Sequence, residues 1–156
     1  GIRIRPMSYQ AHHAMAKNLM ERAVEQAEKG ELVYASFYMD EGIHEMKNII
    51  DNPAYSRGYK YSLHALIDMS IKYSNISRRD MELEEVQYIK EKIMIMNNKE
   101  MDSYIMIGIK KYVSYCQNHD FKGICEPIIM RHYENISDIK EATEDDYLIE
   151  NLDWDE

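Results

Sequence analysis

The sequence predicts an all-α fold: a single-domain bundle of five to six helices that opens with an antiparallel helical hairpin and ends with an acidic tail. Two observations carry this prediction. Apolar residues recur at spacings of three and four along most of the chain, which is the period of one face of an α-helix. Capping and helix-breaking residues separate these stretches, and 156 residues suffice to bury a core without metal or disulfide support.

Three segments are expected along the chain. Residues 1–7 form an N-terminal extension with Met7 as the expected natural start, residues 8–140 form the helical bundle, and residues 141–156 form the acidic tail. The tail contains eight Asp or Glu residues and no Lys or Arg, so it accounts for most of the net charge of −9. The rest of the chain is almost neutral, which argues against broad nucleic-acid binding through a basic surface.

The first predicted element is a helical hairpin that turns at Gly30, the residue best suited to the left-handed conformation after a helix. Ser8 is expected to cap the first helix, and Pro53 to stop the second because proline cannot continue the helical hydrogen bonding. Ala35 and Gly42 lie seven residues apart on one face, so they predict a close approach between neighbouring helices. The apolar stripes of the two helices are Ala16, Met20, Ala23 and Ala27, then Leu32, Ala35, Met39, Gly42, Met46 and Ile49.

Four further helices are expected after the hairpin. The third covers about residues 54–73, and a capping box at residues 77–80 opens the fourth, which ends at residues 97–98. The fifth, at residues 100–117, contains a stretch that is apolar on every side and is therefore predicted to be the central helix. Pro127 is expected at the first position of the sixth helix, after a loop.

The sequence also predicts a cellular compartment. No apolar run approaches the roughly 20 residues that a membrane-spanning helix needs. The first residues lack the apolar middle of a secretory signal, and the chain has only 2 Cys. These features predict an intracellular, cytoplasmic protein without a membrane span.

Both cysteines and two histidines gather in one short stretch, as Cys116-x2-His119-x5-Cys125-x6-His132. Two thiolates and two imidazoles make a tetrahedral zinc shell, and a loop held between two helices is a place where a structural ion is useful. The competing interpretation is that Cys116 is a small buried residue of an apolar helix. Apart from this zinc ion, the sequence implies no cofactor.

A second candidate site pairs Arg57 with His64 in the third predicted helix. The Arg-x6-His spacing resembles metal-independent ribonucleases built on small helical bundles, in which the histidine acts in acid–base catalysis and the arginine stabilises phosphate. The helix pair joined at Gly30 is similar in its rhythm to the helical nucleotide-binding domains of such ribonucleases. It is equally similar to tetratricopeptide helix pairs, and both similarities cover the first third of the chain. The alternative is a half-buried structural histidine, since His64 stands between Leu63 and Ala65.

The tail combines apolar anchors with acidic neighbours, which is the feature most suggestive of function. The anchors are Tyr147, Leu148, Leu152 and Trp154. The run Leu152-Asp153-Trp154-Asp155 resembles tryptophan-acidic peptides that dock in the grooves of helical-repeat proteins. An aromatic anchor there supplies contact area, and the acids steer it toward a basic groove. The alternative is that these side chains fold back over the open end of the bundle.

The sequence favours a non-enzymatic helical protein that acts through protein–protein interaction, either by self-association or through a partner groove. With 12 Met and 13 Tyr, its apolar stripes suit adaptable contacts. The alternative function is a metal-binding or nucleic-acid-processing helical enzyme. That enzyme would use zinc at Cys116, His119, Cys125 and His132, or the ribonuclease-like pair Arg57 and His64.

Overall fold

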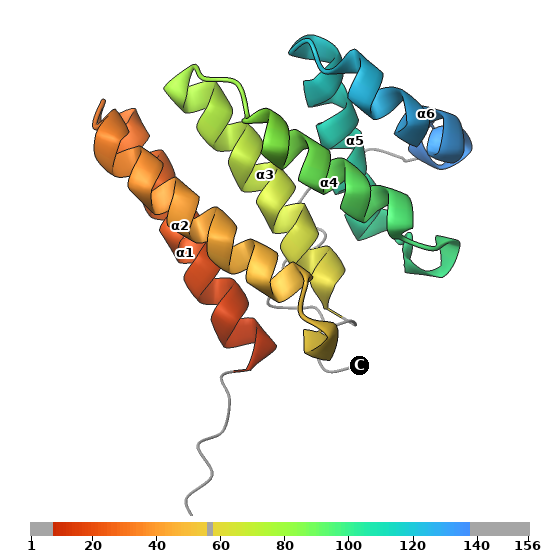
Figure 1. Ribbon diagram of the computed structural model, residues 1–156, viewed down its shortest axis with the longest axis horizontal. Coiled ribbons are helices and arrows are strands. Elements are labelled where there is room, and N and C mark those ends of the chain that lie inside the picture. Colours follow the sequence, from red (N-terminus) through yellow and green to blue (C-terminus); the bar gives the residue numbers. More distant parts are fainter. Residues whose placement is uncertain (1–7, 56–57, 138–156) are drawn as a thin grey trace, which may run out of the picture.

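In the computed structural model, which describes residues 8–55 and 58–137, the chain folds into helices joined by short loops (Figure 1). Over this part of the chain there are six α-helices, two short 3-10 turns and no strand. The elements are α1 (Tyr9–Glu28), α2 (Leu32–Ile50), η1 (Pro53–Tyr55), α3 (Tyr59–Ser77), α4 (Leu83–Ile95), η2 (Asn98–Glu100), α5 (Ser103–Asn118) and α6 (Lys122–Ser137). The predicted all-α fold is confirmed. The predicted extension (1–7) and tail (141–156) lie outside the described residues.

α1 and α2 lie side by side and form the antiparallel hairpin that the sequence predicts (Figure 1). The hydroxyl oxygen of Ser8 accepts a hydrogen bond from the N–H of Ala11 at 3.2 Å and so caps α1. Gly30 has a φ of 80°, in the left-handed region, as expected for the residue that turns the chain between the helices. Every residue of the two predicted stripes is buried except Leu32, which is half-buried.

The closest approach inside the hairpin is at Gly42. A methyl group built on its α-carbon would lie 2.5 Å from Cγ of Met20 and 3.2 Å from the carbonyl oxygen of Ala16. A side chain at this position would displace the neighbouring helix, so the small-residue seam predicted from the sequence sets how tightly α1 and α2 pack.

α3 is the helix around which the others are arranged. It packs against α1, α2, α4 and α5, and in Figure 1 it lies between the hairpin and α5. The sequence predicts α5 in this role because it is apolar on every side, and residues 104–109 are indeed all buried. However, α5 packs mainly against α3 and α6. An all-apolar stretch therefore identifies a core helix without identifying the central one.

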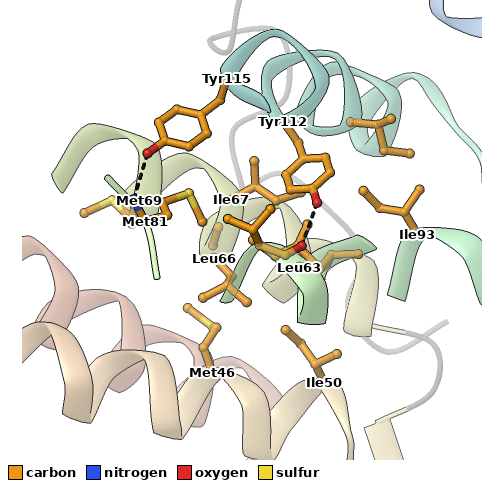
Figure 2. Packing of buried hydrophobic residues seen from close by; sticks show 14 of the residues in the cluster. Met46, Ile50, Leu63, Leu66, Ile67, Met69, Met81, Ile93, Tyr112 and Tyr115 are labelled. Atoms are coloured by element: carbon orange, nitrogen blue, oxygen red, sulfur yellow. Dashed lines mark hydrogen bonds between the residues drawn. The ribbon is translucent and has the colours of Figure 1, made fainter. Parts of the chain in front are cut away.

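The hydrophobic core fills the space between the hairpin and the later helices. Figure 2 shows Met46 of α2 lying toward Leu66 of α3, with Tyr112 of α5 and Ile93 of α4 on the opposite side. Tyr112 is fully buried, and its hydroxyl donates a hydrogen bond to the carbonyl oxygen of Val86 at 2.6 Å. The aromatic ring therefore contributes apolar contact area while its polar group remains satisfied.

The boundary between α3 and α4 differs from the predicted one. α3 continues past Tyr73 and ends only at Ser77, because Arg78 adopts a left-handed conformation with φ of 58° and bonds back to the carbonyl of Ser74. The predicted capping box at residues 77–80 is therefore wrong. These residues belong to the end of α3 and the following loop, and α4 begins at Leu83.

The start of α6 also differs. The N–H groups of Ile124 and Cys125 bond to the carbonyl oxygen of Phe121, which begins the helix at Lys122. The prediction that Pro127 opens this helix is wrong, because Pro127 lies inside it and removes one helical hydrogen bond there.

Candidate binding cleft between α2, α3 and α4

A cleft of about 180 Å³ opens where α2 meets the C-terminal half of α3 and the loop that leads to α4. Pockets for drug-sized ligands measure roughly 300–1,000 Å³, so this cleft suits a small molecule or a single side chain. Its apolar lining comes from Met39 and Ile43 of α2 and from Met81 of the loop. The rest of the lining is polar or charged, which distinguishes the cleft from a simple packing defect.

The loop that forms one wall is held in place by Tyr115 of α5. The hydroxyl of Tyr115 accepts a hydrogen bond from the N–H of Met81 at 2.8 Å (Figure 2) and lies 2.8 Å from Oγ of Ser74. Because Oγ of Ser74 donates its own proton to the carbonyl oxygen of Arg79 at 2.6 Å, the Tyr115 hydroxyl must donate to Ser74. Three connected hydrogen bonds therefore fix the shape of the wall.

The lining is strongly acidic, with four carboxylates against one guanidinium. These groups belong to Asp40, Asp80, Glu82, Glu85 and Arg79. Two of the carboxylates have partners: Glu85 lies 2.9 Å from Nζ of Lys47, and Oδ1 of Asp80 lies 2.9 Å from Nδ1 of His119. The other two are exposed and form no ion pair within the described part of the chain. A cleft of this charge favours cations.

α3 contributes three neutral polar side chains to the lining, Ser70, Tyr73 and Ser74. Burial raises the pKa of Tyr73, Arg79 lowers it and Asp40 raises it; the net effect is upward, so the phenol stays protonated and can donate a hydrogen bond. Ser70 is 3% exposed, and its hydroxyl has no hydrogen-bond partner within the described residues. A buried hydroxyl without a partner costs free energy, which a ligand that bonds to it would recover.

Beside the cleft, the N-terminal half of α2 presents three large apolar side chains to solvent. Val33, Tyr34 and Phe37 are 69%, 62% and 69% exposed, and they occupy the outer face of the helix; we call them the α2 patch. The remaining exposed large apolar side chains in the described residues are spread over α1, α4 and α6. They are Met15, Leu83, Ile95 and Met130. The α2 patch is therefore the place where exposed apolar surface is concentrated on one helix face.

The two predicted zinc-binding thiols lie together. Cys116 and Cys125 are both buried, and the two thiols are close enough for each to affect the pKa of the other. Burial raises the pKa of Cys116 to about 12 and also raises that of Cys125. Both sulfurs are therefore protonated thiols near neutral pH, whereas a zinc ligand must lose its proton.

The two predicted zinc-binding histidines have other surroundings. His119 bonds to Asp80 and stacks on Tyr115 with 4.0 Å between ring centroids. His132 is 1% exposed, and neither of its ring nitrogens has a hydrogen-bond partner among the described residues. In that part of the chain no three His, Cys, Asp or Glu side chains are grouped so that they could hold a metal ion. Zinc binding stays a prediction, and it would require these side chains to rearrange.

His64, the proposed ribonuclease-like histidine, is buried rather than half-buried. Its ring packs against Gly108 and lies 4.2 Å, between centroids, from the ring of Tyr104. Burial, with a smaller contribution from the charge of Lys111, lowers the pKa of His64 to about 4. Arg57 lies outside the described residues, so the pairing of Arg57 with His64 stays a prediction.

The predicted docking residues of the tail also lie outside the described residues. They are Tyr147, Leu148, Leu152 and Trp154. Their role stays a prediction.

Of the helices that the structure describes, none combines the length and hydrophobicity that crossing a membrane would require.

Sequence reasoning did not identify the α2 patch or the cleft. A signal for the patch existed, because Val33 and Phe37 lie four residues apart and off the apolar stripe of their helix. No local pattern points to the cleft, since its lining comes from three helices and a loop. Comparison with protein-family models, with curated proteins and with solved structures finds no significant match.

Proposed function

We propose that this protein acts by protein–protein interaction rather than by catalysis, and that its α2 patch binds the same patch of a second copy. The observation that supports this proposal is the exposure of Val33, Tyr34 and Phe37 on one helix face. Concentrated apolar surface is typical of protein interfaces, whereas apolar residues that are exposed singly are common on any protein. Aromatic residues such as Tyr and Phe are also enriched at interfaces.

The order of residues along α2 suits a twofold contact. If two α2 helices pack antiparallel and cross at Phe37, residues equally far before and after the crossing point face each other. Phe37 then packs against Phe37 of the second copy, so that the two exposed aromatic rings cover each other. Because a twofold contact uses the same surface twice, the patch needs no second complementary surface elsewhere on the molecule.

A cysteine at position 37 tests this arrangement, because a residue at the crossing point faces the same residue of the second copy. Phe37→Cys is expected to form a disulfide-linked dimer under mild oxidation, much faster than Met130→Cys at the same protein concentration. Position 130 is a matched control because its side chain is 83% exposed on α6, away from the patch. The natural Cys116 and Cys125 are buried and should not compete. Equal rates of dimer formation for the two variants would contradict the proposal.

A further inference from the structure

We propose that the cleft between α2, α3 and α4 is a binding site for one organic cation, an ammonium or guanidinium group carried on an alkyl chain. The site is separate from the α2 patch, and it does not depend on self-association. Its support comes from the charge of the cleft, the spread of its carboxylates, the unpartnered hydroxyl of Ser70 and the apolar part of its lining.

The charge of the cleft determines whether its ligand is a cation or an anion. Asp40 and Glu82 are exposed carboxylates that form no ion pair within the described part of the chain, and they lie on different sides of the cleft, one on α2 and one at the start of α4. Among the residues that the structure describes, Arg79 is the only cationic side chain in the lining. An anion would meet a net negative wall, whereas a cation placed between these carboxylates is attracted from both sides.

The spread of the carboxylates favours an organic cation over a metal ion. Ca²⁺ takes about 6–8 oxygen ligands at short distances, and no three acidic, His or Cys side chains of the described residues are grouped in that way. A guanidinium carries five N–H donors in a plane, and an ammonium carries three, so either can reach acceptors that are spread around a cleft. Arg79 is exposed, so it can keep its charge in water.

Ser70 gives the cleft a specific polar contact. Its hydroxyl is buried, lines the cleft and has no hydrogen-bond partner among the described residues. The Oγ lone pairs can accept a hydrogen bond from an N–H of the ligand, which would remove the cost of leaving this group unpaired. Tyr73 places an aromatic side chain in the same lining, and the face of a Tyr ring attracts cations.

The apolar lining accounts for the alkyl chain of the proposed ligand. Met39, Ile43 and Met81 offer contacts to methylene groups, and methionine adapts its shape to an irregular partner. A charged head on a short aliphatic chain is the chemistry of a lysine or arginine side chain and also that of a free polyamine. The volume of about 180 Å³ accommodates one such chain.

Titration with small probes tests the proposal and distinguishes the two sources. The probes are N-acetyl-argininamide for a side chain, spermidine for a free polyamine, and N-acetyl-citrullinamide as the uncharged isostere of arginine. At least one of the two cations is expected to bind with a dissociation constant of about 1 mM or tighter, and the citrulline probe at least about tenfold more weakly. The cation that binds more tightly shows whether the ligand of the cleft is a side chain or a free polyamine. If neither cation binds, or if citrulline binds as well as arginine, the proposal is overturned.

Variants of the lining residues show where the cation binds. The double variant Asp40→Asn, Glu82→Gln removes the two unpaired carboxylates at exposed positions and is expected to weaken cation binding about tenfold, while Ser70→Ala should weaken it less. Glu84→Gln is the matched control, because Glu84 is exposed on α4 but does not line the cleft. Unchanged affinity in the double variant, with its helical circular dichroism intact, would place the cation elsewhere.

One more variant separates this proposal from self-association. Phe37→Gln removes the aromatic side chain of the α2 patch and leaves every lining residue of the cleft in place. Cation binding is expected to be unchanged in this variant. If it is lost together with the dimer, the cleft is not an independent site and the inference is wrong.

Discussion

The hydroxyl of Tyr115 accepts a hydrogen bond from the N–H of Met81 at 2.8 Å, which ties α5 to the loop between α3 and α4 (Figure 2). This loop forms one wall of the cleft and carries Arg79. The shape of the cleft therefore depends on a buried side chain that does not itself line it.

Tyr115→Phe is expected to destabilise the protein by about 1–3 kcal/mol, because it leaves the buried N–H of Met81 without its acceptor and removes the donor to Ser74. The free energy of unfolding in urea measures this loss. Tyr38→Phe, at a half-buried position on α2, should change it by less than about 0.5 kcal/mol. Similar small effects for both variants would show that the Tyr115 hydrogen bonds do not hold the loop.

Gly42→Ala is expected to destabilise the hairpin by about 1–3 kcal/mol, although alanine is the better helix former. The added methyl group would lie 2.5 Å from Cγ of Met20, so α1 and α2 must move apart. Gly123→Ala is the matched control: it lies in α6 and its methyl group would meet nothing within 4 Å. Thermal unfolding should show a lower melting temperature for the first variant and an unchanged or higher one for the second. Stabilisation by both would contradict the close packing at Gly42.

Stability is expected to fall as the pH drops from about 6.5 to about 4, because burial lowers the pKa of three histidines, His13, His64 and His132, and favours their neutral form. Burial lowers the pKa of His13 and of His64 from 6.5 to about 4. The unfolded chain therefore binds protons that the folded protein excludes, at a cost of up to about 3 kcal/mol per histidine once the pH reaches 4. Urea unfolding at about pH 7 and about pH 5 measures the loss.

Two variants test the origin of this pH dependence. His64→Gln should reduce the difference in unfolding free energy between the two pH values, since it removes one of the buried groups. His44→Gln should leave the difference unchanged, because His44 is exposed on α2. A pH dependence that is the same in the wild type and both variants would rule out His64 as its source.

The thiols of Cys116 and Cys125 are expected to react with a soluble disulfide reagent only slowly in the folded protein and rapidly in urea. Both are fully buried, and their raised pKa values keep them protonated. The rate at which the two thiols react with the reagent measures this protection. If the purified protein retains one equivalent of zinc, and Cys125→Ser loses both the metal and stability, then the predicted four-ligand site forms after all and the thiol arrangement described above is incomplete.

The sequence was sufficient to predict the hairpin because its determinants are local. The cap at Ser8, the left-handed turn at Gly30 and the seam at Gly42 each depend on residues within a few positions or on a regular spacing. The later boundaries were predicted less well because tertiary contacts override local signals. The loop after α3, for example, is shaped by the hydroxyl of Tyr115 from a distant helix.

The candidate cleft was not predictable from local pattern. Asp40, Ser70 and Glu82 are ordinary polar residues in sequence, and only the packing of α2 against α3 brings them to one cleft. In contrast, the Cys and His residues are close in sequence, yet only the two thiols lie together in the fold. Residues that are close in sequence across two helices and a loop need not have side chains that are close in space. Their distance depends on how the two helices pack against each other.

The mass of the protein in solution tests the proposed function most directly. Sedimentation equilibrium of the full chain, which has a mass of 18.6 kDa, is expected to give twice this value with a dimer dissociation constant of about 10 μM or tighter. Phe37→Gln should return the mass to that of one chain, while Met130→Gln, at an exposed position on α6, should leave the dimer intact. A wild-type protein that stays at the mass of one chain at about 100 μM, or a Phe37→Gln variant that dimerises as well as the wild type, would contradict the account.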